Sequence, residues 1–241
     1  QTQIQSEEEL RRLTQMEAAT NLENTTHIDG STGEPKTVTI PAGFAVSQIE
    51  GENTIADGLV IIDKNGNEFV WVSVPKTNEV YQLTDVKVEN FTNEVYINIE
   101  KDLHNYTMTY RLDSDGVETA NADIYYDGCG IESKEKYNEL KQRMLKSLYE
   151  KEGFWIGRYE TGMENENPYY GNEYSIEHPI EEKPVIKANV YPYTWVRCYQ
   201  AQSLAENMAP VGYTSSLMFG VQWDLVAKSL EYNYPNLNET S

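Results

Sequence analysis

Cysteine and histidine, the side chains that most often carry chemistry, are few in this chain and widely spaced. Cys129 and Cys198 are the only cysteines, and their spacing matches no zinc-binding pattern. His27, His104 and His178 are far apart in the sequence, and none belongs to a metal-ligand or nucleophile motif. Because these residues form no catalytic constellation, we expect the protein not to be an enzyme.

The two cysteines have two interpretations. In a secreted protein, Cys129 and Cys198 are a disulfide candidate that closes a long loop, which is worth about 4 kcal/mol in the chain-entropy model. Two separate buried thiols are the alternative. The sequence leaves both open.

Acidic side chains cluster near one predicted turn. Asp113, Asp115 and Glu118 are candidate calcium ligands, because Ca²⁺ prefers oxygen ligands. A plain acidic turn around Gly116 explains the same residues. We expect no cofactor, with calcium as the one candidate ion.

Tyrosine is abundant, with 18 residues, and it suits both recognition surfaces and strands. Residues 161–184 are polar and rich in Asn, Glu, Tyr and Pro, which predicts a long surface loop. Binding residues often lie on such loops, so Tyr169, Tyr170 and Tyr174 are the candidate contacts to a protein or glycan ligand. An unconstrained connection is the alternative.

The charge of the chain restricts its partners. The formal net charge is −20, from 39 acidic and 19 basic residues, and such a surface repels nucleic acid and anionic membranes. No apolar run approaches the roughly 20 residues that span a bilayer. The chain starts at Gln1 without a signal peptide, so we expect membrane attachment only through a segment outside this sequence.

The N-terminal part predicts a helix followed by a linker. Residues 1–23 have a narrow apolar stripe of Leu10, Leu13 and Met16, which predicts a helical arm that docks on a partner or copies of itself, or the exit of a longer membrane helix. A frayed terminal helix is the alternative. Asn24 to Pro35 is polar and contains glycine, so residues 1–34 are assigned as arm and linker.

Alternating apolar residues predict strands in the next part of the chain. The Asn-Gly pair in the loop Asp63–Asn67 predicts a hairpin turn between residues 59–62 and 69–74 rather than a calcium loop. Residues 75–127 are predicted to be an insertion with two further strands. The predicted strands are residues 37–40, 44–46, 59–62, 69–74, 95–99, 106–112 and 154–160.

Helical spacing recurs in the second half. Ser133 is predicted to cap a helix that ends near Gly153, with a buried stripe of Tyr137, Leu140, Met144 and Leu148. Residues 191–231 predict a strand, a helix, a short buried strand at Leu217–Phe219 and a last helix. The apolar stripes of these two helices are Ala201, Leu204, Ala205 and Met208, and Trp223, Val226, Ala227 and Leu230. We therefore expect an α+β core with Trp223 buried in it.

Three motifs resemble a known family. Residues 216–224 (SLMFGVQWD) are similar to the "RLPTEAEWE" element of formylglycine-generating enzymes (sulfatase-modifying factors), where Leu217 and Trp223 match but the arginine, proline and glutamates do not. Residues 154–160 (FWIGRYE) resemble the opening strand of that family. With residues 66–74 (GNEFVWVSV), the motifs resemble in order those of Gram-positive bacterial surface proteins that often follow a prepilin-like helix.

The resemblance spans residues 35–231 and implies a C-type-lectin-like domain over residues 35–241, incomplete at the C-terminus. Formylglycine-generating enzymes use a copper-binding cysteine pair, and their ergothioneine-synthase-like branch uses a histidine iron site. Cys129 and Cys198 match neither cysteine position, so the resemblance implies the fold and no catalytic residue.

We therefore expect a non-catalytic display or adhesion domain, extracellular or at the cell surface, joined to a pilin-like stalk. The alternatives are an oxidase of the formylglycine-generating type whose catalytic half is absent, and a structural filament subunit that assembles through the N-terminal helix.

Overall fold

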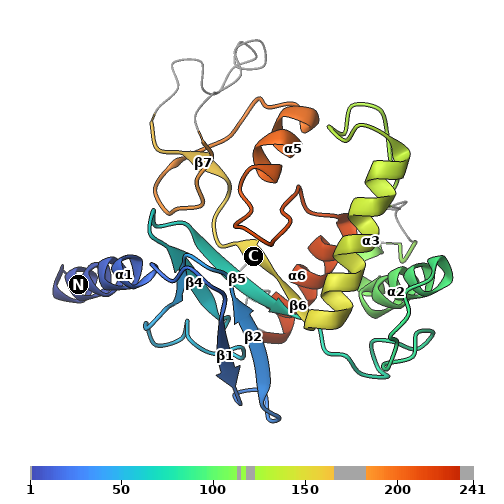
Figure 1. Ribbon diagram of the computed structural model, residues 1–241, viewed down its shortest axis with the longest axis horizontal. Helices are drawn as coiled ribbons and strands as arrows, with labels where there is room; N and C mark the ends of the chain where they lie inside the picture. The colour runs from blue at the N-terminus through green and yellow to red at the C-terminus, as the bar shows by residue number, and fades with distance from the viewer. Residues whose placement is uncertain (1, 113–114, 118–122, 166–182, 234–241) are drawn as a thin grey trace. The chain divides into compact units, whose positions relative to one another are not determined.

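The computed structural model describes residues 2–112, 115–117, 123–165 and 183–233 (Figure 1). The chain divides into two compact units, each made of two stretches of sequence. The first unit is Gln1–Trp71 with Trp155–Leu217, and the second is Val72–Phe154 with Met218–Ser241. Two of the three unit boundaries fall within neighbouring strands of one sheet, β5 (Glu68–Ser73) and β6 (Gly153–Gly157), and the third lies between Leu217 and Met218.

A four-stranded sheet runs in the order β3-β4-β5-β6, with β3 at Phe44–Val46 and β4 at Val60–Asp63. The predicted hairpin is confirmed: β4 and β5 pair antiparallel, with Ile61 opposite Phe69. Asp63 shapes the turn, because its carboxylate accepts from the backbone N–H groups of Asn65 at 2.8 Å and Asn67 at 2.9 Å. Gly66 supplies the positive φ of 84° that this turn needs.

A second, two-stranded sheet corrects the predicted linker. β1 (Thr25–Asp29) lies within residues 24–35 and pairs antiparallel with β2 (Lys36–Ile40). Asp29 fixes the end of β1, since its carboxylate accepts from the backbone N–H of Ile55 at 2.7 Å. The polar composition of this stretch suggested a linker because most β1 side chains face outward, and only Asp29 is buried.

The core of the first unit joins the two sheets. Its fully buried members are Val38, Ile40, Ile55, Leu59, Ile61 and Trp71. The indole rings of Trp71 and Trp155 pack edge to face with centroids 5.0 Å apart, which links β5 to β6.

The N-terminal helix α1 (Thr2–Ala18) is anchored by a buried ion network. Arg12 reaches Glu68 Oε2 at 2.8 Å and Glu52 Oε1 at 3.1 Å. Arg158, just after β6, contacts the same two carboxylates, each at 2.7 Å. The predicted helix is confirmed, but the part of α1 around Arg12 is docked on its own unit rather than extended as an arm.

The remaining elements of the first unit are short. β7 (Gly162–Met163) pairs antiparallel with β8 (Tyr191–Pro192), and α5 spans Cys198–Glu206. Helix α5 confirms the predicted helix, although it ends before Met208. Its one buried residue is Gln202, whose side chain accepts from the backbone N–H of Leu217 at 3.1 Å.

In the second unit, the predicted strand at residues 95–99 is wrong, because α2 (Asn93–Tyr106) covers it. Thr92 caps the helix by accepting from the backbone N–H of Val95 at 3.3 Å. The alternating Val and Ile residues suggested a strand, but Ile99 and Leu103 are buried one helical turn apart while Ile97 is 51% exposed. The strand predicted at 106–112 is also wrong, because a 3₁₀ helix spans Met108–Arg111. Residues 75–127 fall within the second unit.

The predicted helix from Ser133 is confirmed as α3 (Lys134–Lys151), which lies beside α2 (Figure 1). Ser133 caps it, accepting from the backbone N–H of Lys136 at 3.2 Å. Of the predicted stripe, Tyr137 and Leu148 are buried, and Leu140 and Met144 are half-buried. Tyr149 completes this core by packing edge to face on Tyr81, with centroids 5.0 Å apart.

The last helix, α6 (Gly220–Asn233), corrects the prediction for Trp223. Its buried residues include Val221 and Leu225, and Trp223 is 63% exposed. Positions two residues apart differ by about 200° around a helix, so burial of Val221 and Leu225 turns Trp223 outward. The segment Leu217–Phe219 is not a strand but leads into α6, and Phe219 packs edge to face on Tyr137 at 5.5 Å.

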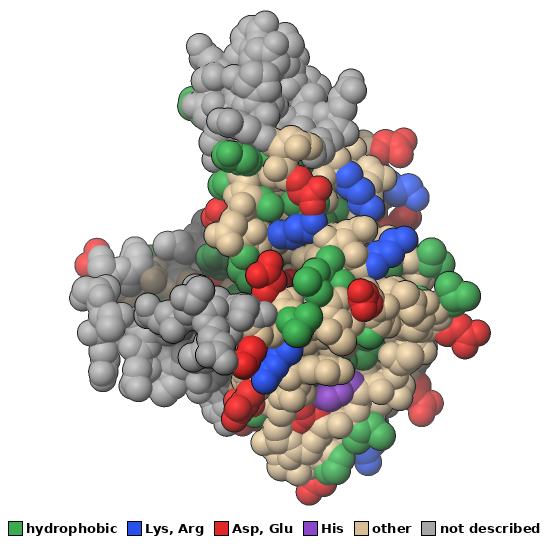
Figure 2. Space-filling model, turned by 90° about the vertical axis from the view of Figure 1, so that its left-hand side faces the viewer, with side chains coloured by type: hydrophobic (Ala, Val, Ile, Leu, Met, Phe, Trp, Pro, Cys, Tyr) green, Lys and Arg blue, Asp and Glu red, His purple; other side chains and the backbone are tan. Residues whose placement is uncertain are grey.

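These elements make the molecule a mixed α+β protein with several small sheets, which confirms the α+β part of the predicted fold class. Among the described residues, no helix has the length and hydrophobicity needed to cross a bilayer. On the face in Figure 2, acidic and basic side chains are interspersed rather than gathered into one patch.

Candidate functional site

Most residues that the sequence singled out for binding lie outside the described part of the chain. This holds for Tyr169, Tyr170 and Tyr174, and for Asp113 and Glu118 of the calcium candidate. Asp115 is described and is exposed. Neither set can therefore be compared with the described part of the structure, and both stay predictions.

The structure does show where the predicted binding loop is attached. The chain leaves the sheet at Met163 and rejoins it at Val185, which forms an isolated bridge with Gly162. Met163 also pairs with Tyr191 of β8. Gly162 is needed here, because a Cβ would lie 2.7 Å from the Tyr191 carbonyl oxygen.

Directly after this attachment, three aromatic side chains are exposed. We call Tyr191–Tyr199 the recognition segment. Within it Tyr191 is 40%, Trp195 49% and Tyr199 48% exposed. Trp195 has a φ of 55°, a left-handed conformation that is uncommon for a bulky residue. Such backbone outliers cluster at ligand-binding sites, which directs attention to Trp195.

Hydrogen bonds hold the backbone of the recognition segment. The N–H of Tyr193 donates to the carbonyl of Thr161 at 2.9 Å, next to β7. The N–H of Arg197 donates to Gln200 Oε1 at 2.9 Å, which fixes the start of α5. The exposed aromatic side chains are therefore carried on a backbone that is tied to β7 at one end and to α5 at the other.

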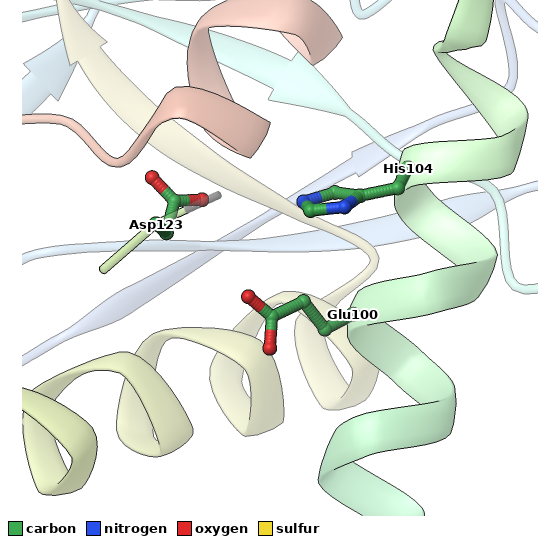
Figure 3. Close-up of side chains that lie close together, drawn as sticks. All are labelled: Glu100, His104 and Asp123. Carbon is green, nitrogen blue, oxygen red and sulfur yellow. The ribbon is translucent and has the colours of Figure 1, made fainter. Parts of the chain in front are cut away.

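A second group of polar side chains lies in the second unit. Glu100 and His104 project from α2 toward Asp123, which precedes α3 (Figure 3). One ligand atom from each residue lies within 4.8 Å of the others, and all three side chains are half-buried. We call these residues the Glu-His-Asp cluster.

Each carboxylate of the cluster has defined hydrogen-bond partners. Glu100 Oε1 accepts from Lys141 Nζ at 2.9 Å, and the same ammonium donates to the Asp123 backbone carbonyl at 3.1 Å. The Asp123 carboxylate accepts from the backbone N–H groups of Gly220 at 2.6 Å and Val221 at 3.2 Å, at the start of α6. Burial, followed by the charge of Asp123, raises the pKa of the nearby Tyr137 above its ordinary value.

An open cleft of about 320 Å³ adjoins the cluster between α2 and α3. Glu100 and Lys141 line it together with Tyr96 and Leu145. The cleft therefore gives solvent a route to Glu100, and the cluster is not sealed within the core.

No motif in the sequence indicated this cluster. Glu100 and His104 are four residues apart, which places them on one helical face, but the stretch was predicted to begin as a strand. The Glu-x-x-x-His spacing is the signal that a correct helix prediction would have exposed. Asp123 is brought in by the tertiary fold alone.

Both cysteines are thiols in the structure, with Cys129 buried and Cys198 half-buried, so the candidate disulfide is not formed there. They belong to different units, Cys129 to the second and Cys198 to the first.

Comparisons with known proteins add no relative. No protein-family model matches the chain, and no curated protein or solved structure shows significant similarity to it.

Proposed function

We propose that this chain is a non-catalytic display or adhesion domain of a bacterial cell surface, which binds a protein or glycan partner through the recognition segment. The observation that carries the proposal is the set of three exposed aromatic side chains in Tyr191–Tyr199, with Trp195 in a left-handed conformation. In the sequence, this segment follows the predicted binding loop that contains Tyr169, Tyr170 and Tyr174.

Aromatic side chains suit this role physically. Tyrosine and tryptophan offer a large apolar face and a polar tip while losing little conformational entropy on binding, so they dominate many recognition surfaces. A half-exposed Trp195 has contact area left to bury against a partner. Because the backbone on both sides is hydrogen-bonded, little further ordering of the segment is needed when it binds.

A C-type-lectin-like fold is part of the proposal. Two of the three family-like motifs fall on the neighbouring strands β5 and β6, and the third leads into α6. This adjacency supports the resemblance, because two of the motifs meet in one sheet.

A second candidate function, a structural subunit of a surface filament, rests on α1. Leu10 is 65% and Leu13 49% exposed, although the same helix is anchored through Arg12. These two leucines are three residues apart, on one face of the helix, and present an apolar strip to a second copy or a stalk. Electron microscopy of protein released from cells distinguishes filaments from single molecules.

The test of partner binding uses the full chain and a matched pair of tryptophan variants. Trp195→Ala should lower binding to a glycan array or to target cells at least about tenfold, since aromatic contacts of this kind are common hot spots. Trp223→Ala is the control, because Trp223 is also exposed but lies on α6, outside the recognition segment. Equal binding by both variants would contradict the role of the segment.

The enzymatic alternative has its own assay. The copper-loaded chain is incubated with oxygen and a cysteine-containing sulfatase peptide, and the peptide mass is followed. Conversion of the cysteine to formylglycine would overturn the non-catalytic proposal.

A further inference from the structure

We propose that the Glu-His-Asp cluster binds a divalent transition-metal ion, with Zn²⁺ as the best match, through Glu100, His104 and Asp123. This inference concerns the second unit and is independent of the recognition segment. It rests on the convergence of the three side chains, with ligand atoms within 4.8 Å of one another (Figure 3).

Helix α2 aligns two of the ligands. Glu100 and His104 are four residues apart, so their side chains stack on the same face of the helix, one turn apart. The helix is fixed by the Thr92 cap and by the burial of Ile99 and Leu103 on its core side. These contacts hold the two ligands in place before an ion arrives, which lowers the entropic cost of binding.

Asp123 is oriented by the start of α6. Its two oxygens accept from the backbone N–H groups of Gly220 and Val221, and each carboxylate oxygen has a further lone pair for a metal. Gly220 permits this approach, because a Cβ there would lie 3.1 Å from Asp123 Oδ1. Such partners behind a metal ligand commonly set its orientation and raise affinity.

The ligand types select the class of ion. Ca²⁺ and Mg²⁺ take oxygen ligands, whereas an imidazole nitrogen with two carboxylates suits Zn²⁺ and neighbouring transition metals. Two ligands at about 2.1 Å from a tetrahedral zinc lie about 3.4 Å apart, so the side chains need only a small inward adjustment. Three protein ligands leave the fourth position to water.

The ammonium group of Lys141 contacts the same Glu100 carboxylate that the metal ion would bind. Its ammonium is 2.9 Å from Glu100 Oε1, and the two side chains are 16% and 22% exposed. This ion pair neutralises Glu100 without metal, and the adjoining cleft gives the flexible lysine side chain room to swing away. Lys141 and the metal therefore compete for the same carboxylate.

The experiment measures Zn²⁺ affinity of the full chain by competition with a chromophoric chelator, at about 0.15 M salt with excess Mg²⁺ to suppress binding to the acidic surface. We expect one tight site. His104→Gln should weaken it at least about tenfold, and Lys141→Met should strengthen it because the competing ammonium is removed while its packing is kept. His27→Gln is the control for a histidine outside the cluster.

Circular dichroism checks that each variant is folded, and the histidine ring signals in NMR spectra show which imidazole Zn²⁺ shifts. A shift of His104 alone, lost in Glu100→Gln, supports the proposal. Equal affinity of the original chain and His104→Gln, or absence of a tight site in both the original chain and Lys141→Met, would overturn it.

Discussion

At the scale of single residues, the ion network around Glu52 and Glu68 shows how buried charge is stabilised. Each carboxylate contacts both Arg12 and Arg158, and the two glutamates are buried while the arginines keep part of their side chains exposed. Burial raises the pKa of Glu52, but hydrogen bonds from Arg158 and Ser47 and the two arginine charges outweigh it, so the pKa is lowered overall. Two positive and two negative charges thus neutralise one another inside the first unit.

This network predicts a pH-dependent stability. A lowered folded-state pKa means that the unfolded chain binds more protons, so the contribution of Glu52 is present above the ordinary pKa near 4.5 and is lost as the pH falls below it. Glu52→Gln should reduce the free energy of unfolding by about 3 kcal/mol at pH 7, because it leaves the arginine charges incompletely paired. The difference in the free energy of unfolding between Glu52→Gln and the original chain should become smaller between about pH 5 and pH 3.

Urea unfolding followed by tryptophan fluorescence at several pH values measures this difference. Glu139→Gln serves as the control, because Glu139 forms an exposed ion pair with Lys136. A difference between Glu52→Gln and the original chain that stays constant on acidification would contradict the assignment.

At the scale of elements, Arg12 makes the ion pairs that hold α1 to the first unit, and the buried side chain of Gln15 adds to the contact. Arg12 is its one described contact to Glu52 and Glu68, while the neighbouring Arg11 is exposed. The helix has a narrow apolar stripe and would be marginal in water by itself. Its helicity therefore depends on docking rather than on intrinsic propensity.

We predict that Arg12→Ala loosens the docking of α1 while Arg11→Ala does not. Loss of the ion pairs should accelerate amide exchange within α1 at least about tenfold, because local opening no longer has to break them. Hydrogen-exchange mass spectrometry of the N-terminal peptide measures the effect. Similar protection in the two variants would show that Arg12 does not anchor the helix.

The helices of the second unit depend on their caps. Thr92 and Ser133 each accept from a backbone N–H in the first turn, of α2 and α3 respectively. Thr92→Ala should lower the free energy of unfolding by about 1 kcal/mol, and Thr92→Ser should retain most of it because serine caps equally well. Chemical denaturation measures both variants. Equal losses of unfolding free energy in Thr92→Ala and Thr92→Ser would contradict the role of the hydroxyl group.

At the scale of the whole molecule, the net charge of −20 dominates the electrostatics. Like charges spread over a surface repel one another in the compact state, and added salt screens this repulsion. We predict that the Tm rises by a few degrees between about 10 mM and 300 mM NaCl. Differential scanning calorimetry measures it, and a Tm that falls with salt would indicate that attractive pairs outweigh the repulsion.

The sequence by itself determined the features that depend on neighbouring residues. The sequence predicted the Asn-Gly turn between β4 and β5, the Ser133 cap of α3 and the α+β class. These features were predictable because turn chemistry, capping and hydrophobic spacing act over a few residues. The sequence also showed that the spacing of the two cysteines matches no zinc-binding pattern.

The tertiary structure decided what depends on partners distant in the chain. Val95, Ile97 and Ile99 favour a strand locally, yet the burial of Ile99 and Leu103 on one face makes the segment a helix. Trp223 was expected to be buried because its spacing placed it on a predicted apolar stripe, but packing of Val221 and Leu225 turned it outward. Likewise, Asp123 reaches His104 only because its carboxylate is bound at the start of α6, a contact between residues almost a hundred positions apart.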